Sequence, residues 1–494
     1  MKLRDYQLIA VEKIRQSFRN GNKRVLLVAP TGSGKTVIAS HMIKMAQLKH
    51  KGSLFVAHRR ELVMQCSNKL ADFEVNHGIM MAGKSANSMA TTQVASIQTF
   101  HARKDGDYFI KPKGDLIMLD EAHRSASKTF KDLIDDYPDA YVIGLTATPC
   151  RADGKGLGAV YDDLVECASI KELTDQGYLV PNNIVAPTMP DLEGLKIVAG
   201  DYEKRGLSKR MNQPKLVGDL VTHWKRHGQH RPTVVFAVSI AHSKYIANIF
   251  NQNGIPAGHI DGDMPEIERE QVLSDLHTGK IKVLSNCQVL TEGWDEPKVS
   301  CVILARPTKS YAMYLQMVGR SLRPFTGKQD TLIIDHAGCV YEHGFPEDVP
   351  EWELTENRIQ SPRQKKSEPI EKQPWTCLQC DHVYKPVRGD ISCPVCGFTP
   401  TKKEKQVLIK QGRLVELEKE KITPQHKLDF LAQLIYHARQ RGYKEGWASW
   451  TFKEKFGHFP HTKRVMPKPV GDEVNGFLHH LRIKKAKRKV NAYE

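Results

Sequence analysis

Residues 25–36 read Val25-Leu26-Leu27-Val28-Ala29-Pro30-Thr31-Gly32-Ser33-Gly34-Lys35-Thr36, an apolar run that leads directly into a glycine-rich loop. A helix-like stretch follows at 37–43, and this strand–loop–helix order is typical of a phosphate-binding loop, although Ala29 stands where the usual pattern begins with glycine. Such a loop turns backbone N–H groups toward an anion, and the start of the helix adds a favourable field. We expect Lys35 to reach the β- and γ-phosphates of a nucleoside triphosphate, and Thr36 to offer its hydroxyl to Mg²⁺. The residues predicted to hold the nucleotide are Gly32, Ser33, Gly34, Lys35 and Thr36.

Two carboxylates end the apolar run 116–119, in the sequence Asp120-Glu121-Ala122-His123. Parallel sheets present their chemistry at the carboxyl ends of strands, so this pair should lie at the edge that carries the phosphate loop. There Asp120 can hold Mg²⁺, through water, and Glu121 can polarise an attacking water. A solvated acidic turn is the alternative, and the phosphate loop upstream argues against it.

A third motif lies far downstream, in the sequence Gln316-Met317-Val318-Gly319-Arg320-Ser321-Leu322-Arg323. Arg320 and Arg323 are three residues apart, so on a helix they would share one face. Together with Gln316 they could reach a γ-phosphate held by another lobe and stabilise the charge that develops on the transferred group. A surface helix with two solvated arginines is the alternative. The three motifs together predict two lobes that close on a nucleotide, with these catalytic residues: Lys35, Glu121, Gln316, Arg320 and Arg323.

Short apolar runs recur in two series, at 25–28, 54–57, 116–119 and 141–145, and again at 233–236, 281–284, 299–304 and 331–334. Strands that are buried on both faces of a parallel sheet read in this way. A chain of 494 residues is also too long for one hydrophobic core. We predict an α/β protein with two tandem parallel-sheet lobes at 1–183 and 184–341, a linker at 342–374, a zinc ribbon at 375–400 and a basic, mainly helical segment at 401–494.

Four of the ten cysteines form two pairs, Cys377-x2-Cys380 and Cys393-x2-Cys396. Each pair can sit on a tight knuckle, and four thiolates around one centre suit a closed, structural Zn²⁺ site. An iron–sulfur cluster is a less typical use of this spacing, and a reducing compartment disfavours disulfides. Several polar and aromatic residues surround the pairs and could grip nucleic acid or dock a protein: Trp375, His382, Tyr384, Lys385 and Arg388.

The charge balance is strongly basic, with 73 Lys and Arg against 56 Asp and Glu and a net charge of +17. This suits a polyanionic partner, because each neutralised phosphate releases a counterion, and general solubility is the alternative. Aromatic residues and lysines alternate at 446–457, and 461–494 is rich in Lys and Arg. Phosphate contact without sequence readout is one interpretation of this end. A solvated tail beside a small helical core is the other.

Uninterrupted apolar stretches stay well below the ~20 residues that a membrane helix needs. The start, Met1-Lys2-Leu3-Arg4-Asp5, lacks the apolar centre of a signal peptide. We therefore expect a cytoplasmic protein without membrane contact, nucleoid-associated if bacterial. We also expect it to be a monomer.

The ordered motifs resemble those of the superfamily 2 helicases and translocases of the DEAH type, over roughly residues 1–340. The resemblance also rests on Leu3-Arg4-Asp5-Tyr6-Gln7, Thr146-Ala147-Thr148-Pro149 and stretches at 57–62, 95–99, 235–239, 259–262 and 290–297. It implies two RecA-like lobes that bind ATP. The TATP form, the 290–297 segment and the cysteine cluster look most like the bacterial RadD family and its phage-borne relatives. Type III restriction motor subunits share the core, but the C-terminal third shows no convincing nuclease constellation.

The resemblance also implies further site residues. Gln7 would contact adenine, and Gly293 and Asp295 would link the nucleic-acid track to the nucleotide. The residues implied to contact nucleic acid are His58, Arg59, Arg60, Gln98, Thr99, Ser239 and Thr291.

The predicted function is that of an ATP-dependent DNA helicase or translocase in repair, recombination or replication, with ATP, Mg²⁺ and Zn²⁺ as cofactors. Its partner would be single-stranded or forked DNA, and a single-strand-binding protein or a recombinase is a candidate protein partner. A DNA-stimulated ATPase that remodels nucleoprotein without unwinding is the main alternative, and an RNA helicase is a third. The sequence shows no obvious strand-separating pin.

Overall fold

The computed structural model describes the chain apart from residues 1, 152, 188, 199, 229, 292, 349–351, 358, 360–373, 388–389, 401–408, 411–412, 415–423, 445, 457, 461–464, 472–473, 475–476, 479–480 and 482–494. Two compact units are present, Met1–Val415 and Glu416–Glu494. The centre of the predicted linker, Arg388 and the basic tail lie outside the described residues.

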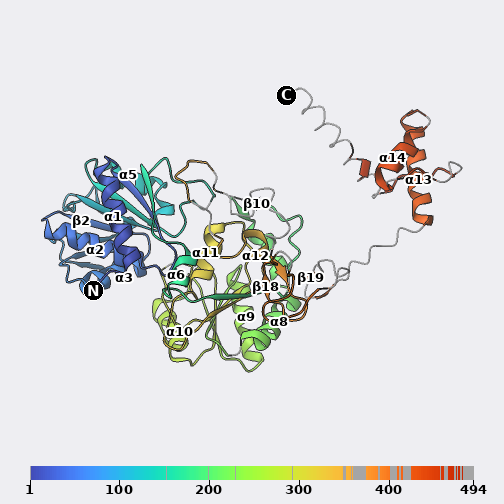
Figure 1. Cartoon of the computed structure of the whole chain (residues 1–494). Helices are drawn as coiled ribbons and strands as arrows, with labels where there is room; N and C mark the ends of the chain where they lie inside the picture. The colour runs from blue at the N-terminus through green and yellow to red at the C-terminus, as the bar shows by residue number, and fades with distance from the viewer. Residues whose placement is uncertain are drawn as a thin grey trace. The chain divides into compact units, whose positions relative to one another are not determined.

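The first lobe is built on a sheet with the strand order β4-β3-β5-β2-β6-β7-β1-β8, parallel except for the β3–β4 pair (Figure 1, blue to cyan). Strands β1, β2 and β6 are almost wholly buried, as apolar runs covered on both faces should be. β7 lies between β1 and β6, so the ends of the phosphate-loop strand and the carboxylate strand are one strand apart. Its elements are α1 (Asp5–Arg19), β1 (Arg24–Val28), α2 (Lys35–Leu48), β2 (Ser53–Ala57), α3 (Arg60–Asp72), β3 (Gly78–Met81), β4 (Lys84–Ala86), β5 (Thr92–Ser96), α4 (Ile97–Arg103), β6 (Leu116–Asp120), η1 (Ala122–Arg124), α5 (Lys128–Asp135), β7 (Tyr141–Thr146), β8 (Asp163–Glu166) and α6 (Ile170–Asp175).

The second lobe has a wholly parallel sheet in the order β13-β14-β12-β15-β16-β9. β9 is the first strand of this sheet in sequence order and pairs with β16, so the second lobe begins at about Asn182. Its elements are β9 (Asn182–Val185), β10 (Ile197–Val198), β11 (Asp201–Tyr202), α7 (Lys204–Met211), α8 (Pro214–His223), the π-helix η2 (Trp224–Gly228), β12 (Thr233–Phe236), α9 (Ile240–Gln252), β13 (Ala257–Ile260), α10 (Glu266–Thr278), β14 (Val283–Asn286), β15 (Cys301–Leu304), α11 (Tyr311–Gly319), β16 (Thr331–Asp335) and α12 (Cys339–His343). The prediction of two tandem parallel-sheet lobes is confirmed.

Small elements follow the second lobe. The cysteine cluster carries the antiparallel pair β17 (Trp375–Thr376) and β18 (Val383–Tyr384), and a second short pair is formed by β19 (Ile409–Lys410) and β20 (Arg413–Leu414). The C-terminal unit contains α13 (Pro424–Gln440) and α14 (Trp447–Phe456). These helices bury a core of their own around Phe430, Leu434 and Phe452.

Candidate functional site

The phosphate loop leaves β1 and wraps tightly before α2 begins. Gly32 and Gly34 have φ angles of +89° and +84°, a left-handed conformation that strains other residues. A Cβ on Gly34 would lie 2.6 Å from the side-chain amide nitrogen of Gln7. Glycine at this position is therefore required both by the backbone angle and by the space that Gln7 leaves.

Lys35 is the first residue of α2, and its ammonium group donates to the carbonyl of Ala29 at 3.1 Å. Burial lowers the pKa of this lysine, Glu121 and Asp120 raise it, and Arg320 and Arg323 lower it further. The two carboxylates and the two distant arginines are thus electrostatic neighbours of Lys35. An anion in this loop would compensate the buried positive charge.

Asp120 ends β6 and Glu121 directly follows it, and both are buried, at 5% and 7% exposure. Glu121 has a φ of +49°, uncommon for a residue with a side chain and frequent at functional sites. The Asp120 carboxylate accepts from the backbone N–H of Glu121 at 3.0 Å, and the Glu121 carboxylate lies 3.3 Å from His123 Nδ1. A buried carboxylate close enough to Lys35 to raise its pKa suits a divalent cation, so Asp120, with Thr36 next to Lys35 in the chain, would hold Mg²⁺, which would neutralise phosphate charge.

Gln7 supports the phosphate loop from behind. Its amide nitrogen donates to the carbonyl of Ser33 at 3.0 Å, the Tyr6 hydroxyl donates to the same carbonyl at 2.7 Å, and the Gln7 amide oxygen accepts from the Arg4 N–H. The Arg4 guanidinium lies 4.6 Å from the centre of the Tyr178 ring. Gln7 therefore holds Ser33 in place here, and its contact with adenine stays a prediction.

The arginine motif reaches this loop from the second lobe. A Cβ on Gly319 would lie 2.6 Å from Thr31 Cβ, and one on Gly32 would lie 3.1 Å from Arg323 Cγ. Burial lowers the pKa of Arg323 to about 10, which leaves it a cation at neutral pH, and its partner is Asp295. The two lobes therefore meet at the phosphate loop.

One prediction about these arginines is wrong, because they do not share a helix face. α11 ends at Gly319, Arg320 is the capping residue and Arg323 lies beyond it. The chain leaves the helix where Leu322 becomes buried and its carbonyl accepts from the N–H of Val180 at 2.8 Å. Arg320 instead donates to the carbonyls of Trp294, at 2.6 Å, and Thr291.

The 290–297 segment forms the other side of the interlobe contact. Gly293 has a φ of +75°, and its carbonyl accepts from the Gln65 side chain at 2.6 Å. Arg59 donates to the carbonyl of Val289 at 3.1 Å, and Arg60 lies 3.5 Å from Glu266 of α10. Residues at and near the start of α3 in the first lobe therefore contact the same segment whose carbonyls accept from Arg320.

A groove of about 570 Å³ opens between the lobes and contains only part of the predicted nucleic-acid set. His58 and Gln98 line it, and the Gln98 amide donates to the His58 carbonyl at 3.0 Å. Gln316 lines it from α11. Arg124 and Arg151 also line the groove and were not predicted. Arg124 directly follows the stretch Asp120-Glu121-Ala122-His123, and Arg151 comes two residues after the TATP stretch that ends at Pro149.

The other predicted nucleic-acid residues lie outside that groove lining. Thr99 is buried in α4, and the Thr291 hydroxyl donates to the carbonyl of Gln288 at 3.1 Å. Ser239 caps α9 by accepting from the His242 N–H, and its hydroxyl lies 2.8 Å from that of Ser208. Their contact with nucleic acid stays a prediction.

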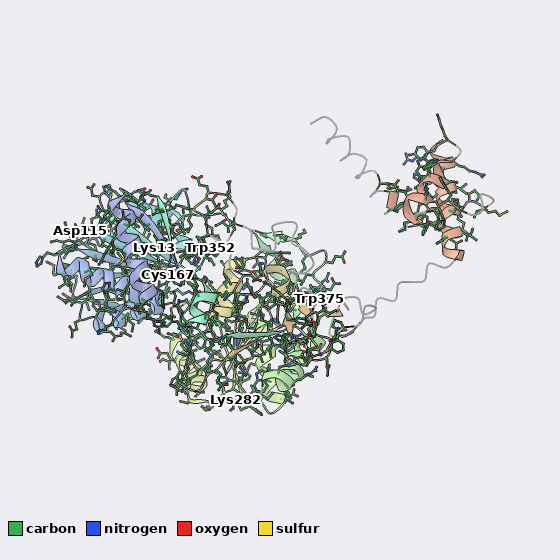
Figure 2. The ribbon with its side chains drawn as sticks, in the orientation of Figure 1. Lys13, Asp115, Cys167, Lys282, Trp352 and Trp375 are labelled. Atoms are coloured by element: carbon green, nitrogen blue, oxygen red, sulfur yellow. The ribbon has the colours of Figure 1, made fainter. Side chains whose placement is uncertain are left out.

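A strap after the second lobe returns to the first, at the loop that follows Thr146-Ala147-Thr148-Pro149. The N–H groups of Gly156 and Gly158 donate to the carbonyls of Asn357 and Thr355 at 2.8 and 3.0 Å. Trp352 lies beside the first lobe (Figure 2). It lines a small cavity together with Thr31 and Gly319. We call the described residues of 352–359 the strap; they lie within the predicted linker, and their contacts with the first lobe were not predicted.

The cysteine cluster has the geometry of a metal site. The four sulfur atoms lie within 4.8 Å of one another, with Cys377–Cys396 at 3.5 Å and Cys380–Cys393 at 3.7 Å. Zinc at ~2.3 Å from four thiolates places the sulfurs about 3.8 Å apart. The four cysteines fit Zn²⁺, which would close the ribbon as a structural centre.

The ribbon is docked on the second lobe. Asp381 lies 3.0 Å from Arg226 and 3.2 Å from His227, and its carbonyl accepts from the N–H of Ala186 at 3.1 Å. Tyr384 is buried, and its hydroxyl donates to the carbonyl of Ile391 at 2.8 Å. Lys385 forms an ion pair with Asp348. Trp375 packs against the cluster (Figure 2). These neighbours of the cluster make contacts within the chain.

In the C-terminal unit part of the aromatic stretch is packed in a small helical core and part of it is exposed, and phosphate contact by this end stays a prediction. Phe452 is buried, whereas Trp450 and Phe459 are exposed, at 65% and 44%. Lys453 lies over both exposed rings, 5.3 and 4.5 Å from their centres. Among the described residues, the helices are too short or too polar to cross a membrane.

Comparisons with known proteins agree with this geometry. Residues 1–151 match the family described as type III restriction enzyme, res subunit, and residues 212–324 match the helicase conserved C-terminal domain. The chain is 30% identical to a 51.5 kDa protein of a Lactococcus phage, over 80% of this chain and 83% of that protein. It is 32% identical to a Saccharomyces cerevisiae protein named as the ATP-dependent helicase Irc3, over 68% of this chain but only about half (52%) of the yeast protein.

A solved structure shows the same fold. The fragment structure of an HsdR subunit of a type I restriction enzyme from Vibrio vulnificus YJ016 superposes with a TM-score of 0.54 at 24% identity, over 69% of this chain and 67% of that one. The motifs, the contact of the two lobes at the phosphate loop and the matches to these two families lead to one conclusion. The chain belongs to the superfamily 2 helicases that carry a res-subunit domain followed by a helicase C-terminal domain.

Proposed function

We propose that this chain is an ATP-driven DNA translocase or helicase, related to the RadD family and acting in DNA repair, recombination or replication. The observation that carries the proposal is the contact of Gly319 and Arg323 with the phosphate loop. Hydrolysis then depends on closure of the two lobes, and the interlobe groove couples closure to a bound strand.

The proposed chemistry assigns one role to each group. Lys35 binds the phosphates, Glu121 orients the attacking water, and Arg320 and Arg323 stabilise the charge that develops on the transferred group. Arg320 is held by the segment that Arg59 and Gln65 contact from the first lobe, so movement of α3 would reach it directly.

Two observations support DNA as the polyanion. The net charge is +17, and the match on the first lobe is to a subunit of restriction enzymes, which act on DNA. His58, Gln98, Arg124 and Arg151 would contact the strand in the groove. A cytoplasmic, nucleoid-associated location, a monomeric state and a partner such as a single-strand-binding protein or a recombinase stay predictions.

The test is steady-state ATP hydrolysis with single-stranded DNA, duplex DNA, forked DNA or RNA, with Lys35→Ala as the control. We expect DNA to stimulate hydrolysis by wild-type protein more than RNA does, and no stimulation of the variant. Equal or greater stimulation by RNA would contradict the choice of DNA and leave the two-lobe ATPase standing.

A further inference from the structure

Trp352 is a buried tryptophan of the strap and lies outside every motif named above. It is 9% exposed and belongs to the hydrophobic core that also contains strand β1 and much of α11. Tryptophan has the largest side chain and buries a large apolar area, so its burial at one place constrains the elements that pack around it. The elements around Trp352 come from both lobes.

Trp352 lies at the seam between the phosphate loop and α11. A small cavity at this seam has a volume of about 20 Å³, which is room for about one water molecule. Beside the indole it is lined, among others, by Pro30, Thr31 and Ala147 of the first lobe and by Leu315, Gly319 and Leu322 of the second. The indole therefore occupies the place where the phosphate loop and the arginine motif adjoin, and little space is left beside it.

Aromatic rings of the second lobe support the indole from one side. The ring of Tyr311, the first residue of α11, has its centre 6.1 Å from that of Trp352. Tyr311 lies 5.8 Å from His343, and His343 stacks on Tyr314 at 5.2 Å. The Tyr314 hydroxyl donates to the carbonyl of Gly344 at 3.0 Å. Trp352 thus continues a series of rings that packs α11 against the end of α12.

The first lobe holds the strap from the other side, through its backbone. The N–H of Ile359 donates to a carbonyl of the loop 154–158 at 2.8 Å, in addition to the two hydrogen bonds that the carbonyls of Thr355 and Asn357 accept. Thr355 is only three residues from Trp352, and three residues span at most about 10 Å. Trp352 therefore stays at the seam as long as the strap stays paired with this loop.

The seam decides where the two arginines lie, because α11 ends at Gly319 and Arg320 and Arg323 follow directly. The close approach of Gly319 to Thr31 fixes one point of the helix against the phosphate loop. The indole shares the cavity with Leu315, one turn earlier, and so fixes a second point. Two fixed points prevent the helix from tilting about the first. A misplacement of about 1 Å at a reacting group can cost about a hundredfold in rate.

We propose that Trp352 is a positioning residue of the ATPase site, which holds α11 at the distance and angle from the phosphate loop at which Arg320 and Arg323 reach the transferred phosphate. The strap keeps the indole there and is anchored on the lobe that binds the nucleotide. This inference rests on the proposed function, because Trp352 acts through the two arginines. Loss of the indole should slow hydrolysis and leave ATP binding intact, since the phosphate loop belongs to the first lobe.

The experiment measures ATP binding and single-turnover ATP hydrolysis in the full chain. The test variant is Trp352→Ala, and the matched control is Leu354→Ala, which shortens an apolar strap residue that packs against the same core without lining the seam cavity. We expect Trp352→Ala to hydrolyse ATP about 10- to 100-fold more slowly, with a Kd for ATP within roughly twofold of wild type. Trp352→Phe should retain most of the rate, and the control should hydrolyse ATP at close to the wild-type rate.

A second comparison separates positioning from stability. The variant Arg320→Ala with Arg323→Ala lacks the groups through which Trp352 acts, so adding Trp352→Ala to it should slow hydrolysis by no more than about twofold further. A purely structural role would instead multiply the two losses. All rates are measured well below the melting temperature of each variant, and Trp352→Leu takes the place of Trp352→Ala in both comparisons if the alanine variant does not fold.

Hydrolysis at the wild-type rate in Trp352→Ala, an equal loss in Leu354→Ala, ATP binding weakened in proportion to the rate, or fully multiplied losses would each overturn the positioning role. Normal hydrolysis by the variant without both arginines would overturn the proposed chemistry and the positioning role with it. Slow hydrolysis by that variant, together with normal hydrolysis by Trp352→Ala, would overturn the positioning role alone.

Discussion

The phosphate-loop contact and the β10–β11 hairpin both depend on strand ends of the second lobe, yet only the first is visible in the sequence. At the contact, Gly319 leaves no room for a Cβ against Thr31, so chemistry and space specify the residue. The hairpin is held by the Asp201 carboxylate, which accepts from the Thr308 hydroxyl and the Lys309 N–H, two partners more than 100 residues away in the sequence. Phosphate chemistry therefore leaves motifs in the sequence, whereas an element that is held by such distant contacts is visible only in the structure.

The largest effect is expected at the phosphate loop. Lys35→Ala removes the ammonium group that the two carboxylates and two arginines surround, and ATP hydrolysis should fall by about 10²–10³-fold or more. Steady-state phosphate release measures this, and the thermal melting temperature should stay near that of wild type. Near-normal hydrolysis would show that the nucleotide binds elsewhere.

Loss of zinc should come next. Cys393→Ser removes one of four ligands, so the ribbon should release its metal and its contacts through Asp381 with Arg226 and Ala186 should weaken. Metal analysis should give one zinc ion per wild-type chain and little in the variant, with a melting temperature lower by several degrees. Cys287→Ser, at a cysteine outside the cluster, is the control. Full zinc content in the Cys393 variant would contradict the assigned ligands.

The strap should show an intermediate effect. A Cβ on Gly156 would lie 2.0 Å from the Thr355 carbonyl oxygen, so Gly156→Ala must displace the strap and should destabilise the chain by about 1–3 kcal/mol. Thermal unfolding measures this, with Gly218→Ala as the control, since nothing lies within 4 Å of a Cβ there. Equal melting temperatures for both variants would show that the strap contributes little.

The smallest effect is expected in the C-terminal unit. Trp450→Ala should weaken binding of single-stranded DNA by about 1 kcal/mol, because an exposed ring beside Lys453 can stack on a base. Titration at fixed salt measures this, and Met466→Ala, at another exposed apolar side chain, is the control. Identical affinities would favour a purely structural role for the aromatic stretch.

The lobes were predictable because each central strand is a continuous apolar run buried on both faces. β9, which begins Asn182-Asn183, lacks such a run, and only its pairing with β16 reveals it. The phosphate-loop and carboxylate residues were predictable from their spacing. The end of α11 at Gly319 could not be predicted, because it depends on the long-range hydrogen bond between Leu322 and Val180. The strap was missed because its hydrogen bonds to Gly156 and Gly158 are long-range as well.

The central claim is that hydrolysis requires arginines from the second lobe at a nucleotide held by the first. The most direct measurement compares nucleotide binding and hydrolysis in Arg320→Ala and Arg323→Ala. We predict that both variants bind ATP through Lys35 and the phosphate loop and hydrolyse it about 10³-fold more slowly. Variants that bind ATP and hydrolyse it at the wild-type rate would contradict the account.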